Sequence, residues 1–150
     1  MLPWIEFLMT NHIATIPPHL GWIDEHGSHT AVTEAEKEMC RRKFLFKMAR
    51  PIVCADGFKL SVQASMGHYS SPRFTLPYTR YTHFEVQAAY DYDLDFYREC
   101  SKSSIHSQVP REVITRCIDA HGGIADEQPF NEYFDSNEEY FGMLADTDSA

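Results

Sequence analysis

The stretch from Arg50 to Ser65 constrains the fold of this chain more than any other part of the sequence. Residues 58–64 alternate apolar and polar side chains, as in a strand with one buried and one solvent-facing side. A short apolar run, PIVCA, precedes them, and Asp56-Gly57 separates the two runs. Asp-Gly is a strong signal for a two-residue type I′ turn, because both central residues of that turn need positive φ. We therefore predict a β-hairpin that turns at Asp56-Gly57.

Two helices are predicted before this hairpin. Residues 2–9 place apolar side chains on one helical face, and Pro3 suits a first turn. Thr33 and Glu36 have the spacing of a capping box, in which each side chain bonds the backbone N–H of the other residue. We expect the second helix to run from there toward Arg42.

A further strand and a third helix are predicted after the hairpin. Residues 82–88 alternate in the manner of a half-buried strand. Pro110 opens an apolar stripe with helical spacing, which ends at Gly122-Gly123 because glycine ends helices readily. The pattern of residues 91–108 is ambiguous. Together these elements predict an α+β fold, with a small antiparallel sheet of about three or four strands flanked by helices.

Charge is sorted into blocks along the chain. Residues 1–40 carry a net charge of −5, residues 41–80 carry +7 and residues 81–150 carry −11, which gives −9 for the whole chain. Residues 1–123 are predicted to form one domain. Residues 124–150 hold eight acidic and no basic residues, and their aromatic residues recur near helical spacing. This acidic tail is predicted to be an extension that either docks as a helix or becomes ordered on a partner.

Composition limits the class of protein. The apolar fraction of 43% and the aromatic fraction of 13% exclude wholesale disorder. No apolar run approaches the roughly 18–20 residues of a membrane span, and the first residues lack the basic start of a secretory signal. The cysteines favour reduced thiols, although spacing alone leaves a disulfide open. They are widely separated, at Cys40, Cys54, Cys100 and Cys117.

Eight histidines make metal binding worth weighing. His26 and His29 form the tightest pair, but no cysteine or acid stands at a familiar ligand spacing beside them. Cys54, His68 and His83 would converge only if their strands were neighbours. We expect surface or hydrogen-bonded histidines instead, and therefore no metal and no cofactor.

The sequence assigns no catalytic residue, because it has no phosphate-binding loop, dinucleotide fingerprint, GxSxG or zinc finger. The thiols lie in or beside apolar stretches, which favours core positions. One enzymatic alternative stays open. His26-Gly-Ser28 and His68-Tyr-Ser70 share the His-x-Ser form, and paired histidines can act as base and acid in phosphodiesterases. A small hydrolase would then use His68 with His26 or His83.

Arg73 and Arg80 alternate with aromatic residues in residues 68–81. Such interleaving can stack bases and neutralise phosphates. The net charge of −9 disfavours direct nucleic-acid binding, since phosphate neutralisation dominates that affinity. We expect a loop at a sheet edge whose arginines pair with the acidic tail.

The acidic tail is predicted to contact a partner protein. Carboxylates on a compact surface can mimic a phosphate ladder and occupy a nucleic-acid groove, while aromatic side chains supply the apolar anchors. The alternative is that the tail closes the core of its own domain. The predicted partner-binding residues are Glu132, Phe134, Asp135, Glu138, Glu139 and Tyr140, with Arg73 and Arg80 as a second, basic contact.

Three segments carry a resemblance to a known group of proteins. They are RPIVCADGFKLSVQASMGHYSSPR, then YTHFEVQ, and later VPREVITRCIDAHGGI. This pattern resembles a family of small phage and prophage proteins that have no assigned activity. The resemblance covers residues 50–123, about half of the chain. The family often has a cysteine where this chain has Ser70 or Ser71, and residues 1–49 and the acidic tail look like additions to it.

The resemblance implies a setting and a class of function. The setting is the cytoplasm of an infected bacterium, where small acidic phage proteins often inhibit host machinery, including CRISPR effectors and restriction systems. The implied function is a non-enzymatic inhibitor that binds a nucleic-acid-handling host defence complex. A structural or regulatory phage module is the other non-enzymatic reading.

Overall fold

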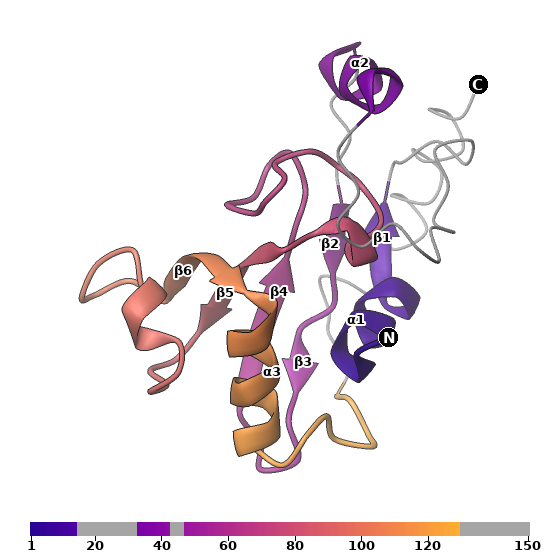
Figure 1. Cartoon of the computed structure of the whole chain (residues 1–150). Helices are drawn as coiled ribbons and strands as arrows, with labels where there is room; N and C mark the ends of the chain where they lie inside the picture. The colour runs from indigo at the N-terminus through magenta and orange to yellow at the C-terminus, as the bar shows by residue number, and fades with distance from the viewer. Residues whose placement is uncertain (15–32, 43–46, 130–150) are drawn as a thin grey trace.

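The computed structural model describes residues 1–14, 33–42 and 47–129 (Figure 1). His26, His29 and the predicted contacts in residues 130–150 lie outside these residues. No helix in the described residues is long and apolar enough to span a bilayer. The elements in chain order are α1 (Pro3–Thr10), β1 (His12–Ala14), α2 (Glu34–Arg42), β2 (Lys47–Ala49), β3 (Ile52–Val53), β4 (Lys59–Gln63), the 3₁₀ turn η2 (Tyr78–Arg80), β5 (His83–Ala88), the 3₁₀ turn η3 (Asp95–Tyr97), β6 (Ile105–Pro110) and α3 (Arg111–Ala120).

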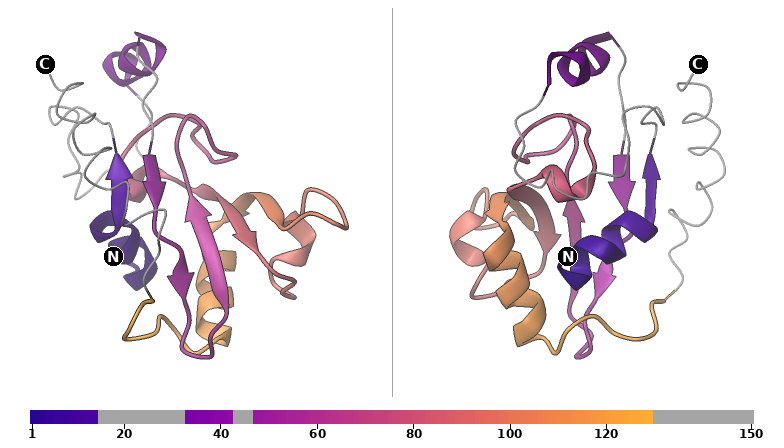
Figure 2. Two further views of the ribbon diagram at one scale, coloured as in Figure 1. Left: turned by 180° about the vertical axis from the view of Figure 1, so that it is seen from behind. Right: turned by 45° about the vertical axis from the view of Figure 1, so that its right-hand side comes forward.

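The centre of the fold is an antiparallel sheet of four strands in the order β3-β4-β5-β6, beside a two-stranded pair, β1-β2. The Gln63 side chain joins the two sheets, since its amide both accepts from Ala49 N and donates to Ala49 O at 2.8 Å. Helices α1 and α3 lie on one face of the large sheet (Figure 2). There the Trp4 indole donates to Thr115 at 3.0 Å and meets the Phe84 ring edge-on. The predicted α+β fold is confirmed.

The predicted helices form where their local signals stand. Pro3 and Pro110 lie at the starts of α1 and α3, and α3 ends where Gly122 and Gly123 take positive φ of 86° and 84°. The stripe of α3 is buried as predicted, at Val113, Ile114, Cys117 and Ile118. The ambiguous stretch 91–108 contains η3 and the start of β6.

The hairpin at Asp56-Gly57 is confirmed, but its turn type is not the predicted one. Gly57 has a φ of +93°, whereas Asp56 does not take positive φ. Gly57 N donates to Cys54 O at 2.9 Å and Cys54 N donates to Phe58 O at 2.8 Å, so the loop holds three residues. The end of α3 contacts this turn, since Asp56 N donates to His121 O at 3.2 Å. The prediction of a two-residue type I′ turn was therefore wrong.

Gly57→Val should cost about 1 kcal/mol or more of folding free energy, because a β-branched residue is strained at positive φ. A Cβ at this position would meet nothing within 4 Å, so the cost comes from the backbone and not from a clash. Urea denaturation measures it. Gly57→Asn is the control and should cost less, since asparagine tolerates left-handed backbone. An unchanged unfolding midpoint for Gly57→Val would contradict the turn.

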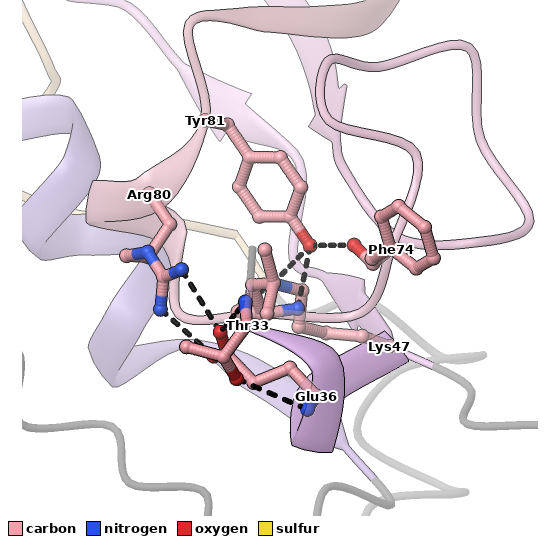
Figure 3. A network of polar contacts seen from close by, with 7 residues as sticks. Thr33, Glu36, Lys47, Phe74, Arg80 and Tyr81 are labelled. Atoms are coloured by element: carbon pink, nitrogen blue, oxygen red, sulfur yellow. Dashed lines mark hydrogen bonds and ion pairs between the residues drawn. The ribbon is translucent and has the colours of Figure 1, made fainter. Parts of the chain in front are cut away.

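The predicted capping box opens α2. Thr33 N donates to Glu36 Oε1 at 2.9 Å, and Glu36 N donates to Thr33 Oγ1 at 3.2 Å. The same carboxylate accepts two hydrogen bonds from the Arg80 guanidinium, at 2.8 and 3.1 Å, and both side chains are buried (Figure 3). Burial alone raises the pKa of Glu36, but the hydrogen bonds from Arg80 and Thr33 outweigh it and lower that pKa below its usual value. Glu36 is therefore an ionised partner that ties α2 to η2.

The buried side chain of Lys47 holds the loop that precedes η2. Lys47 Nζ donates to Leu76 O and to the Tyr81 hydroxyl, and it lies 3.8 Å from the centre of the Tyr78 ring. The Tyr81 hydroxyl accepts from Leu76 N at 2.8 Å and donates to Phe74 O at 2.5 Å (Figure 3). Burial lowers the pKa of Lys47 well below its ordinary value. These contacts shape the loop, and residues far apart in the sequence make them.

Both outer strands of the large sheet are paired with other parts of the chain. On β3, the Gln128 side chain accepts from Val53 N at 2.9 Å and donates to Val53 O at 3.0 Å. On β6, Gln108 N donates to Tyr69 O at 3.1 Å, and an isolated bridge joins Arg98 to His106. Ala125 N also donates to Val53 O at 2.9 Å and Ile124 bridges Cys54, so residues 124–128 are docked on the sheet.

Candidate functional site

Three segments far apart in the sequence meet at His121, just after α3. Its Nδ1 lies 2.6 Å from Asp56 Oδ2 in the hairpin turn, and its Nε2 lies 2.7 Å from Asp91 Oδ2 after β5. The imidazole stacks on Phe58, with ring centres 4.0 Å apart and an interplanar angle of 7°. We call Asp56, Asp91 and His121 the histidine clasp, because one imidazole joins the hairpin, β5 and α3.

The histidine clasp is a site for positive charge. Hydrogen bonds with Asp91 and then with Asp56 raise the pKa of His121 above its usual value. The ring also follows the C-terminal end of α3, where the helix dipole favours a cation.

Two buried thiols lie near the histidine clasp, at Cys54 and Cys117. Burial, with the nearby carboxylates of Asp56 and Asp91, raises the pKa of Cys54 to about 11. Burial also raises the pKa of Cys117, and the Asp91 carboxylate accepts a hydrogen bond from that thiol. A nucleophilic cysteine needs a lowered pKa, so neither thiol is activated by its surroundings.

Residues 90–99 form an acidic aromatic loop, which lies at the side of the sheet away from α1 (Figures 1 and 2). Tyr92 and Phe96 are each 87% exposed and Tyr90 is 67% exposed. Leu94 is fully buried and anchors the loop to the core. The acidic residues of the loop are Asp91, Asp93, Asp95 and Glu99, and its basic residue is Arg98.

The base of this loop is held in place by polar contacts. Asp91 Oδ1 accepts from Asp93 N at 2.8 Å while its other oxygen binds His121. The Arg116 guanidinium lies 3.6 Å from the Asp93 carboxylate. Arg98 binds Asp95 at 3.0 Å and lies over the Tyr90 ring. The loop is thus an ordered surface that presents aromatic side chains to solvent.

The structure separates the two arginines of the predicted basic contact. Arg73 is exposed, lies over the Tyr69 ring and donates to Met66 O at 3.3 Å. Arg80 is buried and forms an ion pair with Glu36 of α2, while its predicted pairing with residues 130–150 of the tail lies outside the described residues. Only Arg73 therefore offers a cationic surface.

His68 and His83 are each engaged locally. His68 Nδ1 lies 2.6 Å from the Ser65 hydroxyl, and burial lowers the pKa of this histidine. His83 Nδ1 lies 2.7 Å from the Thr82 hydroxyl. Among the described contacts, no hydrogen bond joins the two imidazoles. The His68-His26 pairing of the hydrolase alternative falls outside the described residues.

Sequence reasoning missed the histidine clasp and the acidic aromatic loop. Alternating acids and aromatics in residues 90–97 favour neither a strand nor a helix, which left this segment unassigned. His121 directly precedes Gly122-Gly123 and is recognisable only as a helix end.

Comparisons with protein-family models, curated proteins and solved structures find no match to this chain.

Proposed function

We propose that this chain is a non-enzymatic inhibitor that binds a nucleic-acid-handling protein in the cytoplasm of a bacterial host, and that the acidic aromatic loop contacts that protein. The observation that carries the proposal is the exposure of Tyr92 and Phe96, 87% each, on an ordered loop rich in carboxylates. The resemblance to phage proteins supplies the host setting, and a CRISPR effector is one such target.

Exposed aromatic side chains favour a protein interface over a solvated face. Large apolar groups that gather on a surface mark interaction sites. Tyrosine is also among the residues that most often dominate binding energy when a partner buries them. The backbone of the loop is already ordered, so binding there loses less conformational entropy than binding through a disordered segment.

The carboxylates of the loop favour a basic partner. Asp93, Asp95 and Glu99 belong to the same loop as the exposed aromatic residues, and the chain as a whole carries −9. Negative charge on the loop and on the whole chain speeds association with a positive surface and disfavours acidic partners. A groove that binds nucleic acid has such a surface, which supports the inhibitory role.

Like the acidic tail, the loop combines acidic and aromatic residues. A partner could contact both the loop and the tail. The predicted tail contact, from Glu132 to Tyr140, stays a prediction. The raised thiol pKa values of Cys54 and Cys117 support the non-enzymatic part of the proposal, since thiol chemistry needs the thiolate.

Alanine at both Tyr92 and Phe96 should weaken partner binding by at least about 30-fold, since loss of a binding hot spot costs about 2 kcal/mol or more. The partner is captured from host lysate with the wild-type chain, and its affinity is then measured by calorimetry. Wild-type binding should weaken as salt rises and screens the carboxylates. Both substituted positions are exposed, so the melting curve should stay unchanged.

Two matched variants decide between the candidate surfaces. Alanine at both Tyr69 and Arg73 removes the exposed tyrosine and the arginine that lies over its ring in residues 68–81. This variant should keep its affinity for the partner and its inhibition. Charge reversal of the four tail acids tests the tail. Full inhibition by the Tyr92/Phe96 variant would contradict the proposal for the loop, and loss of inhibition in either matched variant alone would move the contact there. The four acids to be reversed are those of the predicted tail contact, Glu132, Asp135, Glu138 and Glu139.

A further inference from the structure

We propose that Asp91, Cys117 and His121 form a binding site for a transition-metal dication of the Zn²⁺ class. One ligand atom from each of these side chains lies within 4.8 Å of the other two. The three residues come from the loop after β5, from the last turn of α3 and from the residue after that helix. Cys117 and His121 are four residues apart, which places them on the same side of the helix end.

The three donors suit zinc. A thiolate sulfur, an imidazole nitrogen and a carboxylate oxygen are the groups that bind Zn²⁺ in proteins, at bond lengths of about 2.0–2.3 Å. In a tetrahedral site such bonds put the ligand atoms about 3.3–3.6 Å apart. His121 Nε2 and Asp91 Oδ2 are 2.7 Å apart, so they must separate by several tenths of an ångström to share one ion.

Asp56 is in place to orient the imidazole of His121. Asp56 binds Nδ1 at 2.6 Å, on the side of the ring opposite Nε2. Histidines that bind metals almost always donate their other N–H to a carboxylate or carbonyl, which fixes the ring and strengthens the ligand. Phe58 stacks on the same ring with an interplanar angle of 7° and restricts its rotation. Asp56 and Phe58 are therefore positioning residues for the site.

The surroundings favour a dication. The C-terminal end of α3 is negative, and Asp93 adds a carboxylate near Cys117. The same groups already hold the His121 ring between two carboxylates when no ion is present. Sequence analysis predicted no metal, so the proposed site departs from that expectation.

Three protein ligands leave one coordination position for water or another small ligand. The His121 side chain is 21% exposed and the Asp91 side chain 9%, so solvent reaches one side of the cluster. Open sites of this kind differ from closed four-ligand structural sites, and they exchange their ion more readily. We infer a site that loads and unloads on the folded chain.

Cobalt(II) titration of the untagged, chelator-treated full chain tests the proposal. We expect one equivalent to bind and to give a near-ultraviolet thiolate-to-cobalt absorption band together with intense tetrahedral bands in the visible. Cys117→Ser should abolish the near-ultraviolet band. Asp56→Asn should keep the band and weaken binding about 10–100-fold. Cys100→Ser removes an exposed thiol outside the site and should change nothing.

Two further measurements guard against misfolding and misassignment. The cadmium-113 chemical shift of the wild-type chain reports sulfur and nitrogen ligands without any substitution, so a poorly folded Cys117→Ser does not decide the result. Glutamine at both His26 and His29 should leave the cobalt spectrum intact. The proposal is overturned if the wild-type chain shows no thiolate band, if the band survives Cys117→Ser, or if the His26/His29 variant loses it.

Discussion

Arg80→Met should lower the free energy of unfolding by about 3–5 kcal/mol, because it leaves the Glu36 carboxylate buried without its guanidinium. The two side chains are 6% and 9% exposed and are joined by two hydrogen bonds. Methionine keeps most of the apolar stem of arginine, so the loss measures the charge partner and not the packing. Urea denaturation gives the value, and a loss under about 1 kcal/mol would contradict a desolvated pair.

The double variant with methionine at both Glu36 and Arg80 is the control for this loss. It should recover much of the stability, because the buried charges then disappear together. Recovery should stay incomplete, since Glu36 also caps α2 through Thr33 N.

Glu36→Gln adds a pH arm to the same measurement. The pKa of Glu36 is lower in the folded chain than its ordinary value of 4.5. Its charge therefore contributes stability that is fully present above pH 4.5 and is lost as pH falls through the folded pKa. The stability difference between wild type and Glu36→Gln should shrink over that acidic range. A pH-independent difference would mean that the carboxylate is not ionised in the folded chain.

Ile114→Ala should destabilise the fold by roughly 2–5 kcal/mol, the usual range for a fully buried aliphatic side chain cut back to alanine. Ile114 is 0% exposed and lies on the face of α3 that covers the sheet. Denaturation measures the loss, and native-state amide exchange provides a second readout. Asp119→Ala, at an exposed position of the same helix, is the matched control and should stay within about 0.5 kcal/mol of wild type. Exchange through α3 as fast as in a loop would contradict a core helix.

Local sequence signals predicted the elements that depend on local chemistry. The Thr33-Glu36 capping box, the glycine stop after α3 and the buried apolar side of β4 all form where their patterns stand. Each involves residues within a few positions of one another, so the necessary contacts are visible in the sequence. The predicted solvent-facing side of β4 is wrong at Gln63, which is buried because its amide bonds Ala49. The type I′ prediction was wrong because Asp-Gly also suits a three-residue loop in which only the glycine takes positive φ, and the local pattern does not distinguish the two turns.

The candidate sites lay beyond such reasoning. The histidine clasp joins positions 56, 91 and 121, and no spacing rule links a turn, a loop and a helix end. Arg80 binds Glu36, 44 positions earlier, and no local spacing rule predicts that pair. Long-range contacts of this kind depend on how the elements pack, which a single sequence does not encode locally.

The pairing of both outer strands limits how another chain can bind this protein. A free edge strand invites a foreign strand to extend the sheet, either in recognition or in aggregation. Here the Gln128 amide bonds Val53 of β3, and Ile124 bridges Cys54 just after that strand. On β6, Tyr69 bonds Gln108 and Arg98 bridges His106. Over the described part of the chain, the large sheet is closed to such extension at these positions. A partner must therefore recognise side chains, and a deletion that begins at Ile124 would uncover β3 and favour self-association through that strand.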